Sequence, residues 1–311
     1  MLLATRRSTA VHDPATGYRL PRGPTSEARA AVRYGGCGQN RTVTMTNPPR
    51  TLGFVLAATE HGAMILNRFD YHRIGTGAYG VGYNLLHAGR YDPIEVRNAV
   101  NMLAARRTHF GDGVVAIDCG ANIGVHTLEW ALSMTGWGSV VAIEAQERIF
   151  YALAGNIALN NCFNARAILA AVAATDGTMR VPTPDYLVPG SFGSLELRQA
   201  ERTEFIGQTI DYADDKLTEI RTLAIDSLGL ARLDLIKIDV EGMELEVLAG
   251  ARQTIARCLP IIIVERLKTG QDALVAALAP NFYRLYHEGL NIIAIHPADP
   301  SLERVVIVPQ S

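Results

Sequence analysis

Four charged side chains crowd into the eight residues KIDVEGME, residues 237–244. Lys237 and Asp239 alternate along a predicted strand, so their side chains share one face. Glu265 ends the apolar strand IIIVE that follows, and the carboxyl ends of neighbouring parallel strands meet at one edge of a sheet. Crowded carboxylates raise at least one pKa above its usual range, which suits a general base. The sequence therefore predicts Asp239, Glu241 and Glu265 as catalytic residues.

The same region allows other roles. Three converging carboxylates offer the oxygen ligands that divalent cations prefer, so a metal is an option that the sequence does not favour, and we assign no metal ligand. Glu244 falls in the first turn of a predicted helix, where an acid stabilises the helix dipole, and we interpret it as structural. His126 lies in another predicted helix, and a lone histidine there is more often structural than catalytic.

A second group of residues lies in the segment VVAIDCGANIGVHT. Asp118 ends an apolar strand, and Gly120 and Gly124 bracket a short turn that contains Asn122. The dinucleotide fingerprint needs glycines spaced G-x-G-x-x-G, but position 122 is Asn and position 125 is Val. This turn can admit a ligand closely without being built around a pyrophosphate.

Glu144 ends the next apolar strand, 24 residues after Gly120. A carboxylate at that position can accept both hydroxyls of a ribose. A ribose-binding acid beside a turn that is not built for a pyrophosphate indicates S-adenosylmethionine (SAM), which has a ribose and no phosphate. Its product after transfer of the methyl group is S-adenosylhomocysteine (SAH). In the structural alternative, the glycines only allow tight strand–helix packing and Glu144 caps a helix. The order of these features at successive strand ends favours the cofactor site.

Alternating apolar strands and amphipathic helices surround these groups from Gly113 onward. Such alternation predicts an α/β fold, a doubly wound and mostly parallel sheet with helices on both faces. Ligands of these folds bind beyond the carboxyl ends of the strands, where the strand order reverses. The segments FYRLYHE and NIIAIHP predict two further strands at the C-terminal end of the sheet.

The chain divides into three predicted parts. Residues 1–44 carry seven arginines and two acids and show no periodicity, so we predict a disordered extension, either a transit peptide or a segment before the true start at Met45. Residues 45–110 predict an N-terminal cap with short strands and a helix capped by Asp92. Residues 111–311 predict the cofactor-binding domain, with an excursion at 176–221 that is too long for an ordinary connection.

Two smaller features concern the predicted surroundings of the site. The glycine- and tyrosine-rich segment 75–91 predicts a loop that forms part of a lid. Ser191 and Ser194 lie in a small-residue loop of the excursion that either closes over a substrate or forms a simple surface hairpin, and the sequence leaves both open.

Composition restricts the function classes. A net charge of −2 argues against a nucleic-acid partner, and no apolar segment is long enough to predict a membrane span. The four cysteines form no C-x-x-C pair, which fits a reducing, cytoplasmic setting. The oligomeric state is left open.

Residues 113–266 resemble the FkbM family of SAM-dependent methyltransferases, in the segments IDCGANIGVHT, VVAIEAQERIFYALAGNIALNN and LDLIKIDVEGMELEVLAGA. The resemblance implies a class I methyltransferase fold, Rossmann-like, with seven strands and a reversed C-terminal hairpin. It places Asp239 beside the methionine moiety of SAM and the acceptor. The implied cofactor contacts are Asp118, Gly120, Asn122, Gly124, Glu144 and Asp239.

The resulting hypothesis is a SAM-dependent methyltransferase that methylates a hydroxyl of a small molecule, a glycan or a natural product. One alternative is an NAD(P)-linked oxidoreductase on the same fold, which the missing glycines disfavour. Another is a methyltransferase-like module that binds SAM or SAH without catalysis, which the acids at 144, 239, 241 and 265 disfavour. The sequence leaves the identity of the acceptor open.

Overall fold

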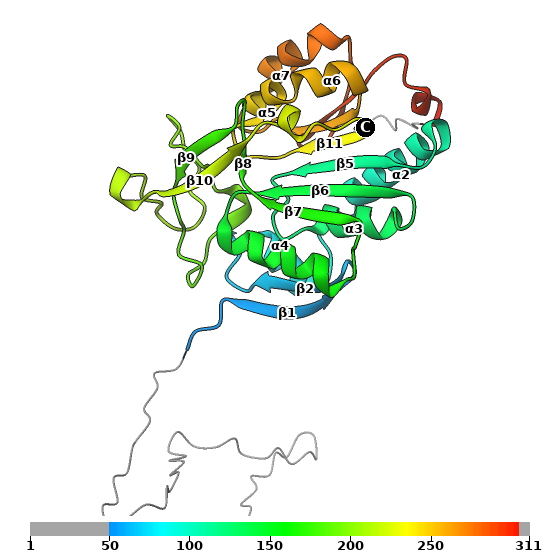
Figure 1. The fold of residues 1–311 in the computed structure, drawn as a ribbon. Coiled ribbons are helices and arrows are strands. Elements are labelled where there is room, and N and C mark those ends of the chain that lie inside the picture. The colour runs from blue at the N-terminus through cyan, green and yellow to red at the C-terminus, as the bar shows by residue number, and fades with distance from the viewer. Residues whose placement is uncertain (1–49, 305–311) are drawn as a thin grey trace, which may run out of the picture. The chain divides into compact units, whose positions relative to one another are not determined.

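A seven-stranded sheet forms the centre of the protein in a computed structural model that describes residues 50–304 (Figure 1). The predicted extension at 1–44 lies outside the described residues. The strand order is β13-β14-β12-β11-β5-β6-β7. The strands are β5 (Val114–Cys119), β6 (Gly138–Glu144), β7 (Ala165–Leu169), β11 (Leu235–Ile238), β12 (Ile261–Glu265), β13 (Arg284–Glu288) and β14 (Asn291–Ile295).

Strand directions confirm the predicted fold class. Five neighbouring strands pair in parallel, in the order β12-β11-β5-β6-β7. β14 is antiparallel to both β12 and β13. The mostly parallel sheet is the one that the alternation of strands and helices predicts, and the seven strands with a reversed C-terminal hairpin are those that the family resemblance implies. The order reverses at β5, which has β6 on one side and β11 on the other, so a ligand site is expected beyond the carboxyl ends of these strands.

Helices cover both faces of the sheet (Figure 1). Strand residues alternate between two cores, as the period of two requires: Ala116 packs with the α2–α4 layer and Ile117 with the α5–α7 layer. One layer contains α2 (Pro93–Phe110), α3 (Val125–Ser133) and α4 (Glu147–Leu159). The other contains α5 (Glu244–Gly250), α6 (Arg252–Cys258) and α7 (Gln271–Leu278). Among residues 50–304, no helix is both long and apolar enough to span a membrane.

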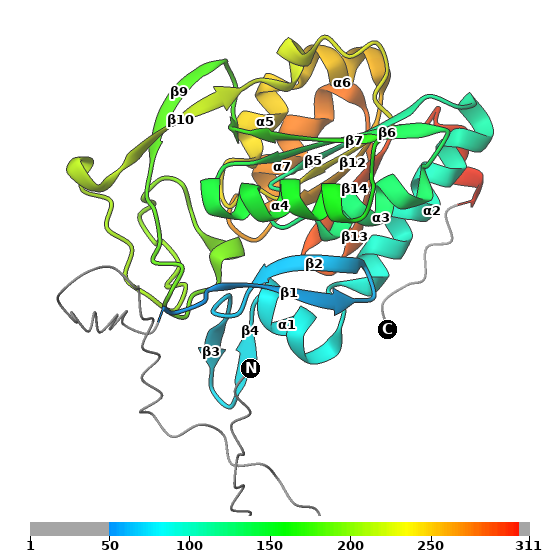
Figure 2. The ribbon, with the colours of Figure 1, turned by 60° about the horizontal axis from the view of Figure 1, so that its bottom comes forward.

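A β-hairpin packs outside α4 (Figure 2). Its strands are β1 (Phe54–Thr59) and β2 (Gly62–Asn67), which pair antiparallel. The fully buried Asn156 of α4 accepts a hydrogen bond from the backbone N–H of Ile65 at 2.6 Å and donates to its carbonyl oxygen at 3.1 Å. The same amide donates to the carbonyl oxygen of Ile123 at 2.8 Å, so it joins the hairpin to the glycine turn.

The prediction of a loop at 75–91 is wrong for most of that segment. It contains the end of a short pair, β3 (His72–Ile74) with β4 (Gly77–Tyr79), and the helix α1 (Val81–Ala88). The helix forms because Val81 and Leu85, one turn apart, are both buried in the core. Asp92 stands at the N-cap of α2 and Pro93 begins the helix, as predicted, but the φ of Asp92 is left-handed at 41° and its side chain makes no capping hydrogen bond.

The excursion after β7 builds a sheet of its own. β8 (Ala171–Val172), β10 (Thr218–Leu223) and β9 (Gly177–Val181) form it in the order β8-β10-β9, and β9 and β10 project from the main sheet (Figure 1). Between β9 and β10 the chain returns to the main domain as a short turn, η1 (Phe192–Ser194). The remaining 3-10 turns are η2 (Asp214–Lys216), η3 (Ile225–Leu228), η4 (Ala279–Asn281) and η5 (Pro300–Arg304).

Buried Asp70 anchors the returning turn. Its carboxylate accepts hydrogen bonds from the backbone N–H groups of Phe192 at 3.0 Å and Gly82 at 2.9 Å. Burial raises the pKa of Asp70 to about 6, although these two bonds oppose the shift. One side chain therefore holds the start of α1 and η1 together.

Candidate functional site

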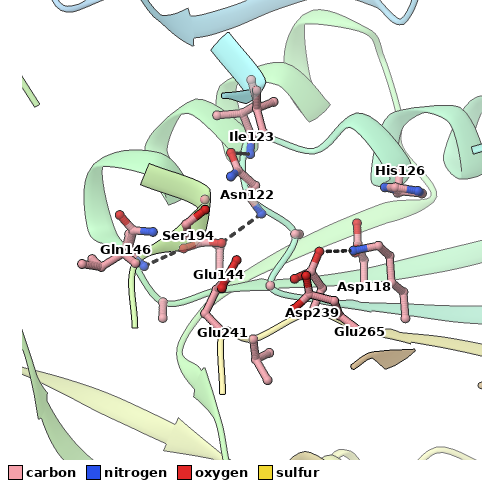
Figure 3. A pocket seen from close by; sticks show the side chains of 18 of the residues that line it. Asp118, Asn122, Ile123, His126, Glu144, Gln146, Ser194, Asp239, Glu241 and Glu265 are labelled. Carbon is pink, nitrogen blue, oxygen red and sulfur yellow. Dashed lines mark hydrogen bonds and ion pairs between the residues drawn. The ribbon is translucent and has the colours of Figure 1, made fainter. Parts of the chain in front are cut away.

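A pocket lies beyond the carboxyl ends of β5, β6, β11 and β12 (Figure 3). The structure places all but one of the sequence-predicted site residues in its wall, and Gly124 is the exception. The predicted residues that line it are Asp118, Gly120, Asn122, Glu144, Asp239, Glu241 and Glu265.

The two glycines of the turn pack against different parts of the structure. Gly120 has a φ of +76°, and a Cβ on it would lie 1.8 Å from the backbone oxygen of Asp239. A glycine is therefore required where the ends of β5 and β11 approach each other. Gly124 has a φ of +94°, and its added Cβ would meet the Leu153 side chain of α4 at 2.7 Å. Its position favours the packing role that the sequence left as an alternative.

Glu144 is held in place by the backbone on both sides. One carboxylate oxygen accepts from the N–H of Asn122 at 2.9 Å and the other from the N–H of Gln146 at 2.8 Å. Burial raises the pKa of Glu144 to about 7, against the lowering effect of these hydrogen bonds. Each carboxylate oxygen can accept a second hydrogen bond. The group is therefore fixed and still able to accept the two hydroxyls of a ribose.

Asp118 offers an oxygen without a partner. Its Oδ2 accepts a hydrogen bond from the Thr127 hydroxyl at 2.7 Å, while its Oδ1 has no partner among the described residues. The residue is 1% exposed and lines the pocket. Since buried polar atoms are nearly always paired in native proteins, this oxygen suits a donor on a bound ligand. Together with the Glu144 carboxylate, it makes the pocket suitable for SAM.

The side of the pocket at the end of β11 contains an ion pair between a buried lysine and a partly exposed aspartate. Lys237 Nζ lies 2.7 Å from Asp239 Oδ2, and the Lys237 side chain is almost fully buried. Burial lowers the pKa of Lys237, but the carboxylates of Asp239, Glu95 and Asp118 outweigh it and raise that pKa above its ordinary value. The ammonium therefore stays charged and fixes the orientation of Asp239.

The two remaining predicted acids differ in their partners. Glu241, at the left-handed φ of 55°, pairs with Lys268 Nζ at 2.5 Å. Glu265 makes no side-chain hydrogen bond among the described residues, and its Oε2 is buried without a partner. Burial and the charge of Asp239 raise the pKa of Glu265 to about 7. Of the three acids, Glu265 is the one with a buried oxygen that has no partner among the described residues and with a pKa raised to about 7.

Glu244 is built into the backbone. It is fully buried and accepts hydrogen bonds from the N–H groups of Val240 at 3.3 Å and Gly242 at 3.0 Å, and also from the Thr269 hydroxyl. These bonds stabilise the turn that enters α5, in line with the structural interpretation of Glu244.

The N-terminal part of the chain contributes residues that the sequence analysis did not assign to the site. The hydroxyls of Tyr79 and Tyr91 lie 2.9 Å apart at the pocket, and both tyrosines line it. Both lie in the glycine- and tyrosine-rich segment 75–91. Its composition predicts a lid beside the site, but it does not show which tyrosines line the pocket. The other unassigned polar residues of the wall are Asp92, Glu95, Gln146 and Asn291.

His126 also faces this end of the pocket. Its Nε2 lies 3.2 Å from Glu95 Oε1. Burial raises the pKa of Glu95, but the close contact with His126 and the charge of Lys237 outweigh burial and lower that pKa to about 2. Glu95 also accepts a hydrogen bond from the Asn291 amide at 2.8 Å. No sequence pattern predicts this contact, because α2, α3 and β14 meet only through tertiary packing.

The serines of the excursion also reach the pocket. Ser191 and Ser194 both line it, and their hydroxyls lie 3.1 Å apart. The described part of the chain, residues 50–304, contains no group of three or more His, Cys, Asp or Glu residues that could hold a metal ion.

Comparison with known proteins gives the relationships of the chain. Methyltransferase sdnD from Sordaria araneosa is 27% identical over 173 residues, which are 48% of this chain and 64% of that protein. The chain thus matches slightly less than two thirds of the relative's length.

Two solved structures are also similar to parts of the chain. Methyltransferase FkbM from Methylobacillus flagellatus KT is 19% identical, with a TM-score of 0.41, over 61% of this chain and 47% of that one. Precorrin-6y C5,15-methyltransferase from Geobacter metallireducens GS-15 is 15% identical, with a TM-score of 0.37, over 66% and 88%. Residues 118–286, more than half of the sequence, match the Methyltransferase FkbM domain, and the chain belongs to that family.

Proposed function

We propose that this chain is a SAM-dependent O-methyltransferase that acts on a hydroxyl group of a small molecule or a glycan. The observation that carries the proposal is the free carboxylate oxygen of Glu265, in the same pocket as the Asp118–Glu144 turn. A neutral hydroxyl is a poor nucleophile, so an O-methyltransferase benefits from a base near the acceptor. Glu265 has the position and the pKa for that role.

The residues of the pocket divide the work. SAM supplies a methyl group on a sulfonium that is already a good leaving group. Glu144 accepts the ribose hydroxyls, and Asp118 Oδ1 accepts a further donor. Lys237 fixes Asp239, which orients the acceptor hydroxyl, while Glu265 Oε2 takes its proton. Gly120 allows the ends of β5 and β11 to approach each other closely. Most of the remaining contribution of the protein to catalysis is to position the acceptor against the methyl donor.

Charge at the pocket also restricts the acceptor. Five of the carboxylates in the wall come from the start of α2, the turn after β11 and the end of β12, and Lys237 is the one ammonium among the lining residues. An acceptor that carries phosphate or carboxylate would be repelled there, so we propose a neutral, hydroxyl-bearing acceptor. The five acids are Asp92, Glu95, Asp239, Glu241 and Glu265.

A label-transfer assay with the full chain tests the proposal. Methyl-labelled SAM is incubated with neutral polyols, glycosides and hydroxylated ring compounds, and the products are analysed for an O-methyl ether. Label on an acceptor oxygen supports the proposal. Label on nitrogen or carbon would contradict the O-methyl assignment, and SAH binding without transfer to any acceptor would favour a non-catalytic module.

A further inference from the structure

Lysine is rare in this chain, which has 3 lysines and 26 arginines. Two of the three, Lys237 and Lys268, lie at or beside the pocket. Lysine is a compact charge with three donors, which suits partners that converge from several sides, whereas the planar fork of arginine suits one carboxylate. The proposed chemistry uses Lys237 but gives no role to Lys268, which follows β12.

Lys268 lies at the meeting point of three segments. Its side chain is 11% exposed, and its Nζ lies 2.5 Å from Glu241 Oε2 in the turn after β11. The same ammonium donates to the backbone oxygen of Ser194 in η1 at 2.8 Å. It also lies 3.3 Å from Glu204 Oε2 and 3.5 Å from Glu196 Oε1, both in the excursion.

The partners of Lys268 include parts of the pocket wall. Glu241 and Ser194 both line the pocket, and they belong to segments more than forty residues apart in the chain. Glu196 is buried and also accepts the N–H of Glu204 at 3.0 Å, so the excursion is folded around the ammonium. Removal of a charge from a buried group of this kind leaves its partners without compensation and is strongly destabilising locally.

We propose that Lys268 is a positioning residue that fastens the excursion segment 191–197 to Glu241 and thereby closes the wall of the active pocket. Its effect on catalysis rests on the proposed methyl transfer, whereas its effect on the pocket wall does not. Arginine could carry the same charge, but Lys268 has four oxygen partners in different directions.

The charge of Lys268 also acts on the acids of the pocket. Glu241 faces Asp239, Glu265 and Tyr79 as well as Lys268. Burial and the charge of Asp239 raise the pKa of both Glu241 and Glu265, and the Lys268 ammonium lowers both. Loss of that ammonium therefore moves their ionisation to higher pH.

Hydrogen exchange of the full-length protein tests the fastening without any activity assay. In Lys268→Met, we expect peptides from the 191–204 region to exchange at least about tenfold faster, because their local opening becomes easier. The matched control is Lys216→Met, which removes an exposed lysine from the same excursion and should leave this exchange unchanged. Unchanged protection in Lys268→Met would overturn the proposal.

A milder variant covers the case in which Lys268→Met does not fold. Glu204→Gln removes a 44% exposed partner and leaves the ammonium with its other contacts. We expect severalfold faster exchange confined to the same region. If Lys268→Met cannot be studied, exchange equal to wild type in Glu204→Gln would overturn the proposal.

The pH profile separates positioning from a general loss of structure. The acid limb of kcat/KM should move to higher pH in Lys268→Met and return toward wild type in Lys268→Arg, which restores the charge. A limb that does not move in Lys268→Met contradicts the effect of the Lys268 charge on Glu265. If the wild-type chain transfers no methyl group at all, the proposed function fails, and hydrogen exchange still decides whether Lys268 fastens the wall.

Discussion

At the scale of single residues, the proposed methyl transfer depends most on Glu265. Its buried Oε2 has no partner among the described residues, and burial raises its pKa to about 7. A base must be ionised to accept a proton, so kcat/KM should fall as the pH decreases below that value. We predict that Glu265→Gln lowers kcat by about 10²- to 10⁴-fold and abolishes this acid limb.

The control for this prediction is Glu246→Gln, which changes a partly exposed acid of α5 that pairs with Arg198. It should leave both the rate and the pH profile unchanged. Calorimetric titration with SAH should give the same affinity for Glu265→Gln and the wild type, because the proposed base does not hold the ribose. Full activity of Glu265→Gln at neutral pH would exclude Glu265 as the base.

The glycine turn allows a second prediction, from a matched pair. Gly120 and Gly136 have similar φ values of +76° and +82°, but an added Cβ meets the Asp239 backbone at 1.8 Å in the first and nothing within 4 Å in the second. Gly136→Ala should cost only the backbone strain, about 1–2 kcal/mol of the free energy of unfolding. Gly120→Ala should cost about 3 kcal/mol or more, because strain and overpacking add. Urea denaturation of both variants measures the difference, and equal losses would show that the close approach of β5 and β11 is not rigid.

At the scale of elements, the attachment of the β1–β2 hairpin to α4 can be tested. Asn156 and Asn160 of this region both bond to β2, but Asn156 is fully buried and the bonds of Asn160 with Ala63 are exposed to solvent. Water can replace the bonds of Asn160 and not those of Asn156. We predict that Asn156→Ala lowers the free energy of unfolding by about 2–4 kcal/mol and that Asn160→Ala lowers it by less than about 1 kcal/mol. Thermal unfolding with calorimetry would measure both, and similar losses would mean that burial does not decide the strength of this contact.

The elements also show which parts of the site can be predicted from sequence. Asp118, Glu144, Asp239 and Glu265 come together because each lies at the carboxyl end of a parallel strand, and strand ends are visible as breaks in apolar runs. The fold class follows from the same alternation of strands and helices. Local patterns therefore define both the sheet and the acids along its edge.

The remaining parts of the site depend on tertiary packing. Glu95 reaches His126 because α2 packs against α3, and no local pattern encodes that contact. The sequence predicts a loop at α1 because five glycines and three tyrosines in segment 75–91 outweigh the apolar face of Val81 and Leu85. Lys268 gave no signal either, since its partners come from segments far apart in the chain.

At the scale of the whole molecule, the charge of the pocket predicts selectivity between acceptors. A neutral acceptor should have a KM at least about tenfold lower than that of its phosphorylated analogue. Added salt should reduce this ratio of KM values, because it screens the repulsion between the acids and the phosphate. Asp92→Asn should also reduce the ratio of the two KM values, because it removes a negative charge from the pocket wall. Asp112→Asn, which changes an exposed aspartate that pairs with Arg107 outside the pocket, is the control. Steady-state kinetics with both acceptors measure the ratio, and a preference for the phosphorylated acceptor would refute the proposed acceptor class.

The measurement that tests the central claim most directly is calorimetric titration of the full chain with SAH and, separately, with NADH. We expect SAH to bind with a Kd of about 1–100 µM, or −8 to −5 kcal/mol, and NADH to show no binding. Glu144→Ala should weaken SAH binding at least about tenfold, while Glu147→Ala, one turn into α4, should not. Binding of NADH without binding of SAH, in a folded protein, would contradict the account and favour an oxidoreductase.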